Sequence, residues 1–437
     1  MMKRLLTLLP TVLLCTVISA REVVTLPRVT TPPISMNSPS PWEWQDWASL
    51  RTPSMPNPPF PYKAFCAYDD RNLYIALEME LGRAPRAGQG CAIPWHSEGA
   101  EFRFALPAPN RLLQLFADAS GAAFVQRNWK FQSLAPIVLR SHATETGYCL
   151  FAAFPWPSLD LTVPPFEKPI NFNLLPQVQE RPLRFKRDDL SLALKAGNEI
   201  VPTASQANVS RAINLNPEPR IINFGRPGYN SRELLSMLPA IFDTHPKTAI
   251  VMVGTNDVTW SKKRLPADEY EANLLRILNA FHDADVKTIL VTIPPCIEEY
   301  VAEREKYTPE QRDALNDEIN EFNARAKRDA SKTGTIVIDY HAQFKGDLRA
   351  ASSLIRNEAN LRSKDGVHPS AEGYRILARL LADAIQTHNL PTSRIVCCGD
   401  SITYGAHMEG QGTTTGETYP AFLRNFLFSN PAHSIAK

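Results

Sequence analysis

Residues near the C-terminus have the types and spacing that nucleophilic catalysis needs. Ser401 follows Gly399 and Asp400 at the end of a short apolar run that starts at Ile395. Such a run, stopping at Gly-Asp-Ser, is typical of a buried strand. The end of this strand would present one hydroxyl at the edge of the sheet, which is where open α/β sheets bind ligands. A serine is a weak nucleophile at neutral pH and requires a base. Ser401 is therefore a candidate nucleophile that needs a base from elsewhere in the chain.

A base lies upstream in the stretch Asp365-Gly-Val-His368-Pro369. Its spacing can bring the Asp365 carboxylate beside one imidazole nitrogen of His368 while the other nitrogen faces the serine. His407 lies closer to Ser401 in sequence and is a rival base, but it has no obvious carboxylate partner. We therefore favour His368.

Two further stretches follow likely strands with small or amide residues. Gly228 comes shortly after the apolar pair at 221–222, and Asn256 follows the apolar run at 249–253. Backbone N–H groups and a side-chain amide at such strand ends are what an oxyanion hole requires. Asp257 and Asp400, which adjoin these groups, are expected to brace the site rather than to react.

These stretches together resemble the SGNH hydrolases, the GDSL-like esterase family that is named for Ser, Gly, Asn and His in four blocks. The resemblance implies a catalytic triad of Ser401, His368 and Asp365. It also implies an oxyanion hole made by the N–H groups of Ser401 and Gly228 and by the side chain of Asn256. In this family the nucleophile block normally opens the domain, whereas here it closes it. We therefore expect a circularly permuted domain.

From residue 220 onward, apolar runs alternate with segments whose apolar residues recur at helical spacing. This alternation indicates parallel strands covered by helices on both faces. Five predicted strands fit the flavodoxin-like, three-layer α/β/α sandwich that the family resemblance implies. We assign residues 201–437 to this α/β domain.

The preceding region, residues 21–200, has a different pattern. Apolar residues alternate at 64–68 and 73–79 around a polar turn at 69–72, which predicts a β-hairpin. Further short strand-like runs follow as far as residue 175 and suggest an antiparallel β-sandwich.

Residues 67–76, 98–102 and 147–156 make this region resemble the family 9 carbohydrate-binding modules. The resemblance implies sugar binding by stacked aromatic rings. Trp95 and Trp129 are the candidate platforms because they are expected in loops. A tryptophan in a small sandwich is more often part of the core, and Trp156, within Phe-Pro-Trp-Pro, is expected to be structural.

Composition excludes several classes of function. Among the 437 residues, 44% are hydrophobic and 21% are charged, as in globular domains. The formal net charge is only +2 and we find no basic cluster interleaved with aromatic residues, so nucleic-acid binding is not expected. No Cys-x-x-Cys or His-rich tract is present, and we predict neither a catalytic metal nor a cofactor.

Residues 1–20 have the pattern of a secretory signal peptide. Lys3 and Arg4 precede an almost wholly apolar run that ends before Ser19 and Ala20. A membrane anchor is the alternative, but this run is shorter than the ~20 residues that span a bilayer, and no other stretch is long enough. We expect a secreted or periplasmic protein without stable membrane insertion.

Export and a sugar-binding module together favour an acetylated plant polysaccharide or oligosaccharide as the substrate, with acetylated xylan as the natural guess. The family resemblance thus implies a carbohydrate acetyl esterase similar to acetyl xylan esterases. A lipid esterase or thioesterase of the same fold remains an alternative. So does a glycan-binding protein whose hydrolase domain is inactive.

Overall fold

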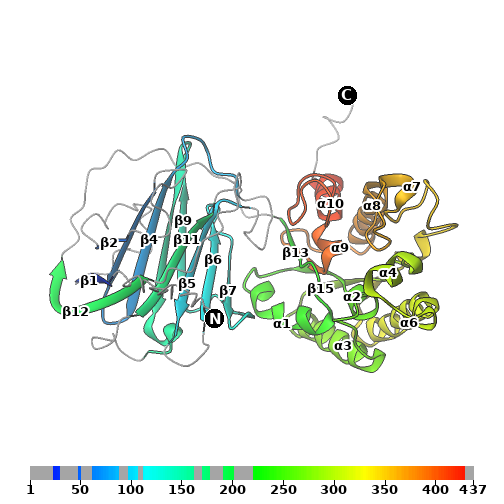
Figure 1. Cartoon of the computed structure of the whole chain (residues 1–437), viewed down its shortest axis with the longest axis horizontal. Helices are drawn as coiled ribbons and strands as arrows, with labels where there is room; N and C mark the ends of the chain where they lie inside the picture. Colours follow the sequence, from blue (N-terminus) through cyan, green and yellow to red (C-terminus); the bar gives the residue numbers. More distant parts are fainter. Residues whose placement is uncertain are drawn as a thin grey trace, which may run out of the picture.

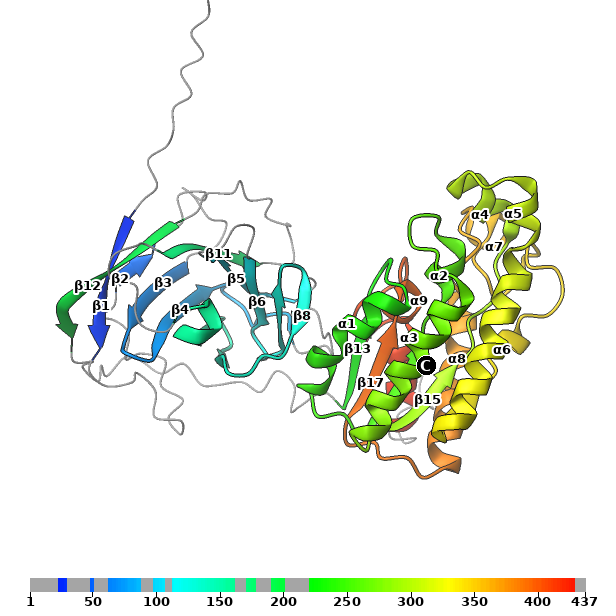
Figure 2. The same cartoon turned by 90° about the horizontal axis from the view of Figure 1, so that it is seen from below.

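The computed structural model of this chain describes residues 23–29, 48–50, 62–87, 97–106, 112–161, 170–177, 190–200 and 220–428. These residues form two β-sheets that lie side by side (Figures 1 and 2). The expected signal peptide and the candidate platform Trp95 lie outside the described residues.

The first sheet, which we call the sandwich, contains twelve strands in the described residues. They are β1 (Val23–Val29), β2 (Ala48–Leu50), β3 (Tyr62–Tyr68), β4 (Asn72–Glu80), β5 (Gly99–Ala105), β6 (Leu112–Asp118), β7 (Ala123–Arg127), β8 (Lys130–Gln132), β9 (Val138–Ala143), β10 (Gly147–Pro155), β11 (Ile170–Gln177) and β12 (Leu190–Ile200). Their order is β8-β7-β6-β5-β11-β12-β1-β3-β4-β10-β9, with β2 beside β3. The ladders are antiparallel, except that β1 is parallel to both β12 and β3.

The expected hairpin is confirmed as β3 and β4. Its turn is held by Asp69, whose carboxylate accepts hydrogen bonds from the backbone N–H groups of Arg71 and Asn72. Apolar side chains from distant strands form one core, and Phe104 of β5 contacts Phe154 of β10 edge to face at 4.7 Å. The sheet therefore folds over on itself with its apolar face inside.

The second sheet has five strands, all parallel, in the order β13-β17-β14-β15-β16. They are β13 (Ile221–Gly225), β14 (Thr248–Met252), β15 (Lys287–Val291), β16 (Ile336–Ile338) and β17 (Ile395–Gly399). The last strand in the sequence therefore lies between the first and second strands of this sheet. We call residues 220–428 the α/β domain.

Helices cover both faces of this sheet, with α1, α3 and α6 on one side and α8 and α10 on the other (Figure 1). The helices are α1 (Ser231–Phe242), α2 (Thr255–Thr259), α3 (Ala267–Asp283), α4 (Glu298–Glu305), α5 (Pro309–Asp313), α6 (Leu315–Thr333), α7 (Glu358–Leu361), α8 (Ala371–Thr387), α9 (Ser401–Tyr404) and α10 (Tyr419–Phe428). The three-layer α/β/α architecture expected from the sequence is confirmed. No helix within the described residues is both long and apolar enough to cross a membrane.

The sandwich contacts the α/β domain through β8 and helix α1. Buried Phe131 of β8 packs edge to face against Tyr229, with ring centroids 6.5 Å apart. Asp243, at the end of α1, accepts hydrogen bonds from the Ser133 hydroxyl and the backbone N–H of Leu134. The contact therefore combines an apolar patch with two hydrogen bonds.

Candidate active site

Ser401 lies where β17, an interior strand of the parallel sheet, turns sharply into α9. Gly399 permits this turn because a Cβ there would lie 2.2 Å from the Met252 carbonyl oxygen and 2.4 Å from the Thr403 hydroxyl. Asp400 caps α9, since its carboxylate accepts a hydrogen bond from the N–H of Ile402 at 2.8 Å. The strand end thus presents the Ser401 hydroxyl at the carboxyl edge of the sheet.

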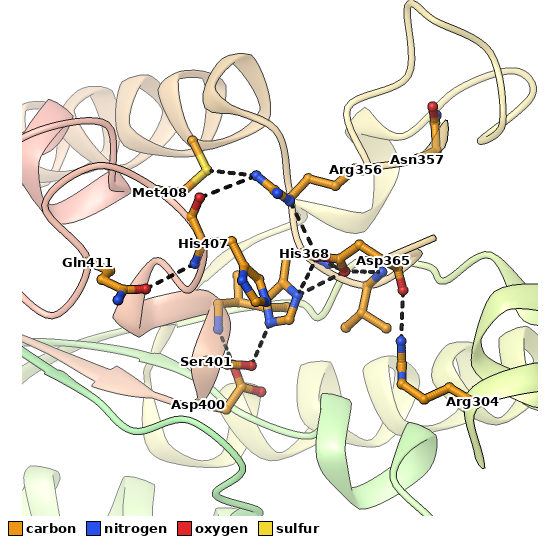
Figure 3. A network of polar contacts seen from close by, with 12 residues as sticks. Arg304, Arg356, Asn357, Asp365, His368, Asp400, Ser401, His407, Met408 and Gln411 are labelled. Carbon is orange, nitrogen blue, oxygen red and sulfur yellow. Dashed lines mark hydrogen bonds and ion pairs between the residues drawn. The ribbon is translucent and has the colours of Figure 1, made fainter. Parts of the chain in front are cut away.

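The loop before α8 brings Asp365 and His368 to this hydroxyl (Figure 3). One carboxylate oxygen of Asp365 accepts hydrogen bonds from the N–H groups of Val367 and His368, and Gly366 completes the turn in the left-handed region at φ +73°. His368 Nδ1 lies 2.9 and 3.0 Å from the two carboxylate oxygens of Asp365. His368 Nε2 lies 2.9 Å from Ser401 Oγ. The structure therefore joins the three residues in one chain of hydrogen bonds.

The charge of Asp365 decides which nitrogen of His368 carries the proton. Burial alone would raise the pKa of Asp365, but the hydrogen bond and charge of His368, with two backbone N–H groups, hold it well below its usual value. An ionised carboxylate only accepts hydrogen bonds, so Nδ1 donates to it. Nε2 is then left to accept the Ser401 proton, which is the arrangement that general-base activation of a serine requires.

Two arginines hold this loop in place (Figure 3). Arg356 Nε lies 3.3 Å from a carboxylate oxygen of Asp365, and both side chains are largely buried. The same guanidinium reaches the segment after α9 through the sulfur of Met408, at 3.4 Å. Arg304 donates to the backbone carbonyl of Asp365 at 2.9 Å. Neither arginine was predicted from the sequence.

Gly228 and Asn256 line the same pocket as Ser401. Gly228 adopts φ +78°, a left-handed conformation that favours glycine. The Asn256 side chain is buried, and its Nδ2 donates to the Tyr229 carbonyl at 2.8 Å. Because an amide nitrogen carries two hydrogens, this bond orients the group and leaves one hydrogen for a ligand. The arrangement can therefore present N–H donors to an oxyanion beside Ser401.

Asp257 and Asp400 are buried behind these groups. Asp257 accepts hydrogen bonds from the backbone N–H and hydroxyl of Ser231, at the start of α1. Burial raises the pKa of Asp257 to about 7 and that of Asp400 to about 6, and the two carboxylates also repel each other. Their contacts are with backbone and hydroxyl groups, which agrees with the expected bracing role.

His407 lies across the pocket from His368, with the two rings nearly perpendicular and 5.2 Å apart. Burial and the neighbouring charges of His368 and Arg356 lower the pKa of His407. Ligand atoms of Asp365, His368 and His407 lie within 4.8 Å of one another, as a metal site would require. However, both oxygens of Asp365 already contact His368 Nδ1. The cluster therefore fits a hydrogen-bonded triad better than a set of free ligands.

The pocket has a volume of about 510 Å³. Its lining includes Trp260, Arg304 and Glu305, none of which the sequence analysis singled out. Trp129, a predicted sugar platform, is not among its lining residues and lies at the tip of the β7–β8 hairpin, 62% exposed. A signal for Trp260 was present in the sequence, since it lies four residues after Asn256.

The solved structures that are similar to parts of this chain include the following three. A GDSL-like lipase from Bacteroides thetaiotaomicron has 23% identity and a TM-score of 0.28, over 37% of this chain and 73% of its own. An acetylxylan esterase from Geobacillus stearothermophilus has 24% identity and a TM-score of 0.29, over 38% and 71%. A family 9 carbohydrate-binding module from Caldicellulosiruptor kristjanssonii has 12% identity and a TM-score of 0.30, over 42% and 100%.

No curated protein sequence matches this chain significantly. The model of the GDSL-like Lipase/Acylhydrolase family, in contrast, matches residues 196–376. This match contains Gly228, Asn256, Asp365 and His368, which the structure gathers in one pocket with Ser401. Residues 196–376 of this chain are therefore similar to the GDSL-like lipase/acylhydrolase family.

Proposed function

We propose that this protein is a serine esterase that removes acetyl groups from plant polysaccharide such as acetylated xylan. The observation that carries the proposal is the hydrogen-bonded chain from Asp365 through His368 to Ser401, at the edge of a pocket that also holds Gly228 and Asn256. A nucleophile, an oriented base and oxyanion donors are the parts that acyl transfer requires.

In the proposed mechanism, His368 Nε2 takes the proton from Ser401 as its oxygen attacks the ester carbonyl. Asp365 keeps the imidazole oriented and stabilises its protonated form. The tetrahedral oxyanion is held by the N–H groups of Ser401 and Gly228 and by Nδ2 of Asn256. His368 then returns the proton to the leaving sugar oxygen. A water activated by the same imidazole releases acetate from the acyl-enzyme.

The substrate class is supported by the sandwich and by its exposed residue Trp129. The sandwich resembles family 9 carbohydrate-binding modules, and Trp129 offers an exposed ring at φ +66°, an unusual conformation for a bulky residue. Residues in such sparsely populated backbone regions cluster at functional sites. We propose that Trp129 contacts the polysaccharide.

Export and circular permutation complete the proposal. The pattern of residues 1–20 supports secretion or transfer to the periplasm. Permutation is supported by the place of β17, the last strand in sequence, between β13 and β14. It is also supported by the family match, which ends at residue 376, before Ser401. Residues 388–393 would then be the link that joins the original ends.

The experiment that tests the function is acetate release from acetylated xylan by the purified protein, beside Ser401→Ala and His368→Ala. We expect release that both substitutions abolish. Hydrolysis of 4-nitrophenyl acetate without release from xylan would retain the esterase and reject this substrate. Activity restricted to long-chain esters would favour a lipid esterase, and binding to xylan without any ester hydrolysis would favour a glycan-binding protein.

A further inference from the structure

Trp260 lines the pocket beside Ser401 but has no part in the proposed reaction. It directly follows α2, the short helix that carries Asn256, and its side chain is half-buried. Its indole lies against the backbone of Gly228, where a Cβ would be 2.4 Å from Cζ3 and 3.0 Å from Cη2. An aromatic surface therefore borders the oxyanion position.

Hydrogen bonds fix the backbone that follows this indole. The Trp260 carbonyl accepts hydrogen bonds from the N–H groups of Lys263 at 2.7 Å and Arg264 at 3.0 Å. The next residue, Ser261, donates its N–H and its hydroxyl to one carboxylate oxygen of Glu305, at 3.1 and 2.8 Å. Lys263 Nζ also lies 5.9 Å from the centre of the Trp260 ring. A backbone fixed in this way lowers the conformational entropy that is lost when a ligand stacks on the ring.

Arg304 and Glu305 supply polar groups to the same pocket. Arg304 Nε lies 3.4 Å from the second carboxylate oxygen of Glu305, so the two opposite charges offset each other. Arg304 also anchors the triad loop through the Asp365 carbonyl, yet 44% of its side chain is exposed. A guanidinium has five N–H donors, so donors remain for a ligand. The pair suits a neutral ligand with several hydroxyls better than an anion.

The size and composition of the pocket also favour a ring over an acyl chain. Its volume of about 510 Å³ is far more than an acetyl group fills. A sugar ring has apolar C–H faces and hydroxyls around its edge, which match an indole face beside donors and acceptors. A long acyl chain would instead place hydrocarbon against Arg304 and Glu305 and desolvate them without hydrogen bonds.

We propose that Trp260 is the platform on which the sugar ring bearing the ester stacks, with Arg304 and Glu305 binding its hydroxyls. This inference rests on the proposed carbohydrate esterase activity and identifies the part of the pocket that recognises a neutral sugar. Trp260 then contributes to the choice of substrate rather than to the chemistry at Ser401.

The test compares kcat/KM for acetylated xylo-oligosaccharides with kcat/KM for 4-nitrophenyl acetate, which lacks a sugar. In Trp260→Ala we expect the ratio of the two values to fall by about tenfold or more, because one stacked contact is lost from the larger substrate. Trp260→Phe keeps a smaller ring and should lie between. Leu361→Ala removes an exposed apolar side chain of α7 that does not line the pocket, and should leave the ratio unchanged.

Two results would overturn the platform. One is an unchanged ratio in Trp260→Ala, or in Trp260→Phe if the alanine variant does not fold. The other is a rise in kcat/KM of Trp260→Ala for 4-nitrophenyl butyrate relative to 4-nitrophenyl acetate. Such a rise would mean that Trp260 limits the length of the acyl group. A wild type that releases no acetate from any saccharide would instead refute the proposed function itself.

Binding can also be measured without turnover in Ser401→Ala. Isothermal titration calorimetry with acetylated xylo-oligosaccharides should show saturable binding to this variant. The apparent affinity should weaken by tenfold or more when Trp260→Ala is added. Equal affinity in the two variants would place the sugar elsewhere.

Discussion

Gly228→Ala is the change whose effect can be worked out most directly from the structure. An L-residue at φ +78° costs roughly 1–2 kcal/mol relative to glycine. The added Cβ would lie 2.4 Å from Cζ3 of Trp260, whereas carbon atoms in contact sit about 3.5–4.0 Å apart. The Gly228 loop and the indole must therefore separate by about 1 Å or more.

Such a displacement is large for an oxyanion donor. These donors act at about 2.7–3.1 Å, and the loss of one typically lowers kcat about 10²–10³-fold. We expect that loss in Gly228→Ala with 4-nitrophenyl acetate as the substrate. The free energy of unfolding, measured in urea, should fall by about 1–3 kcal/mol.

Gly346→Ala provides the matched control. Gly346 has the same φ of +78°, but no atom lies within 4 Å of the position that a Cβ would occupy. This variant should therefore show the backbone strain, about 1–2 kcal/mol of stability, without a change in kcat. If Gly228→Ala kept kcat within about threefold of Gly346→Ala, the reasoning that makes Gly228 an oxyanion donor would be refuted.

Three other changes test the surroundings of the site. Asn256→Ala should lower kcat about 10²–10³-fold with little change in KM, and an effect on KM alone would contradict a role in the transition state. Burial raises the pKa of Asp257 to about 7, so its protonated form stabilises the folded state below pH ~4 and this stabilisation is lost as pH rises to about 7. Thermal unfolding of Asp257→Asn should therefore show a weaker decline from pH 5 to pH 8 than the wild type, and equal slopes would rule this out. Phe131→Ala removes a buried ring at the contact with Tyr229, and should lower the free energy of unfolding by about 3–5 kcal/mol and also lower kcat. If neither quantity changed, the contact between Phe131 and Tyr229 would not support the site.

Elements that have a local residue pattern could be predicted from the sequence. The five parallel strands follow apolar runs, and the turn at Asp365 follows from side-chain to backbone bonds between residues two and three apart. Ser401, His368 and Asp365 could be proposed together because Ser401 follows a predicted strand and the other two lie in the loop before a predicted helix. Carboxyl ends of parallel strands share one edge, so their meeting there did not require knowledge of the structure.

Contacts between segments that lie far apart in the sequence could not be predicted, because no residue pattern relates one segment to the other. Arg356 and Arg304 reach Asp365 from a loop and from the end of α4, and long side chains on such segments can point in many directions. The place of Trp260 in the pocket could not be predicted, because its ring lies against Gly228 and this contact exists only in the folded structure. The alternation of apolar and polar residues predicted the strands of the sandwich. It could not predict which face of that sheet would contact the α/β domain.

The face of the sandwich that contacts the α/β domain is formed by aromatic side chains. Phe116 and Phe124 stack at 4.5 Å and belong, with Phe131, to the apolar core of the α/β domain rather than to the core of the sandwich. This sheet face is covered by the α/β domain, and the sugar contact that we propose for Trp129 lies on an exposed ring outside it. The contact also adjoins Tyr229, whose carbonyl orients the Asn256 amide. The sandwich therefore packs against Tyr229, the residue whose carbonyl holds the Asn256 amide, so that Phe131→Ala tests whether this contact affects the reaction proposed at Ser401.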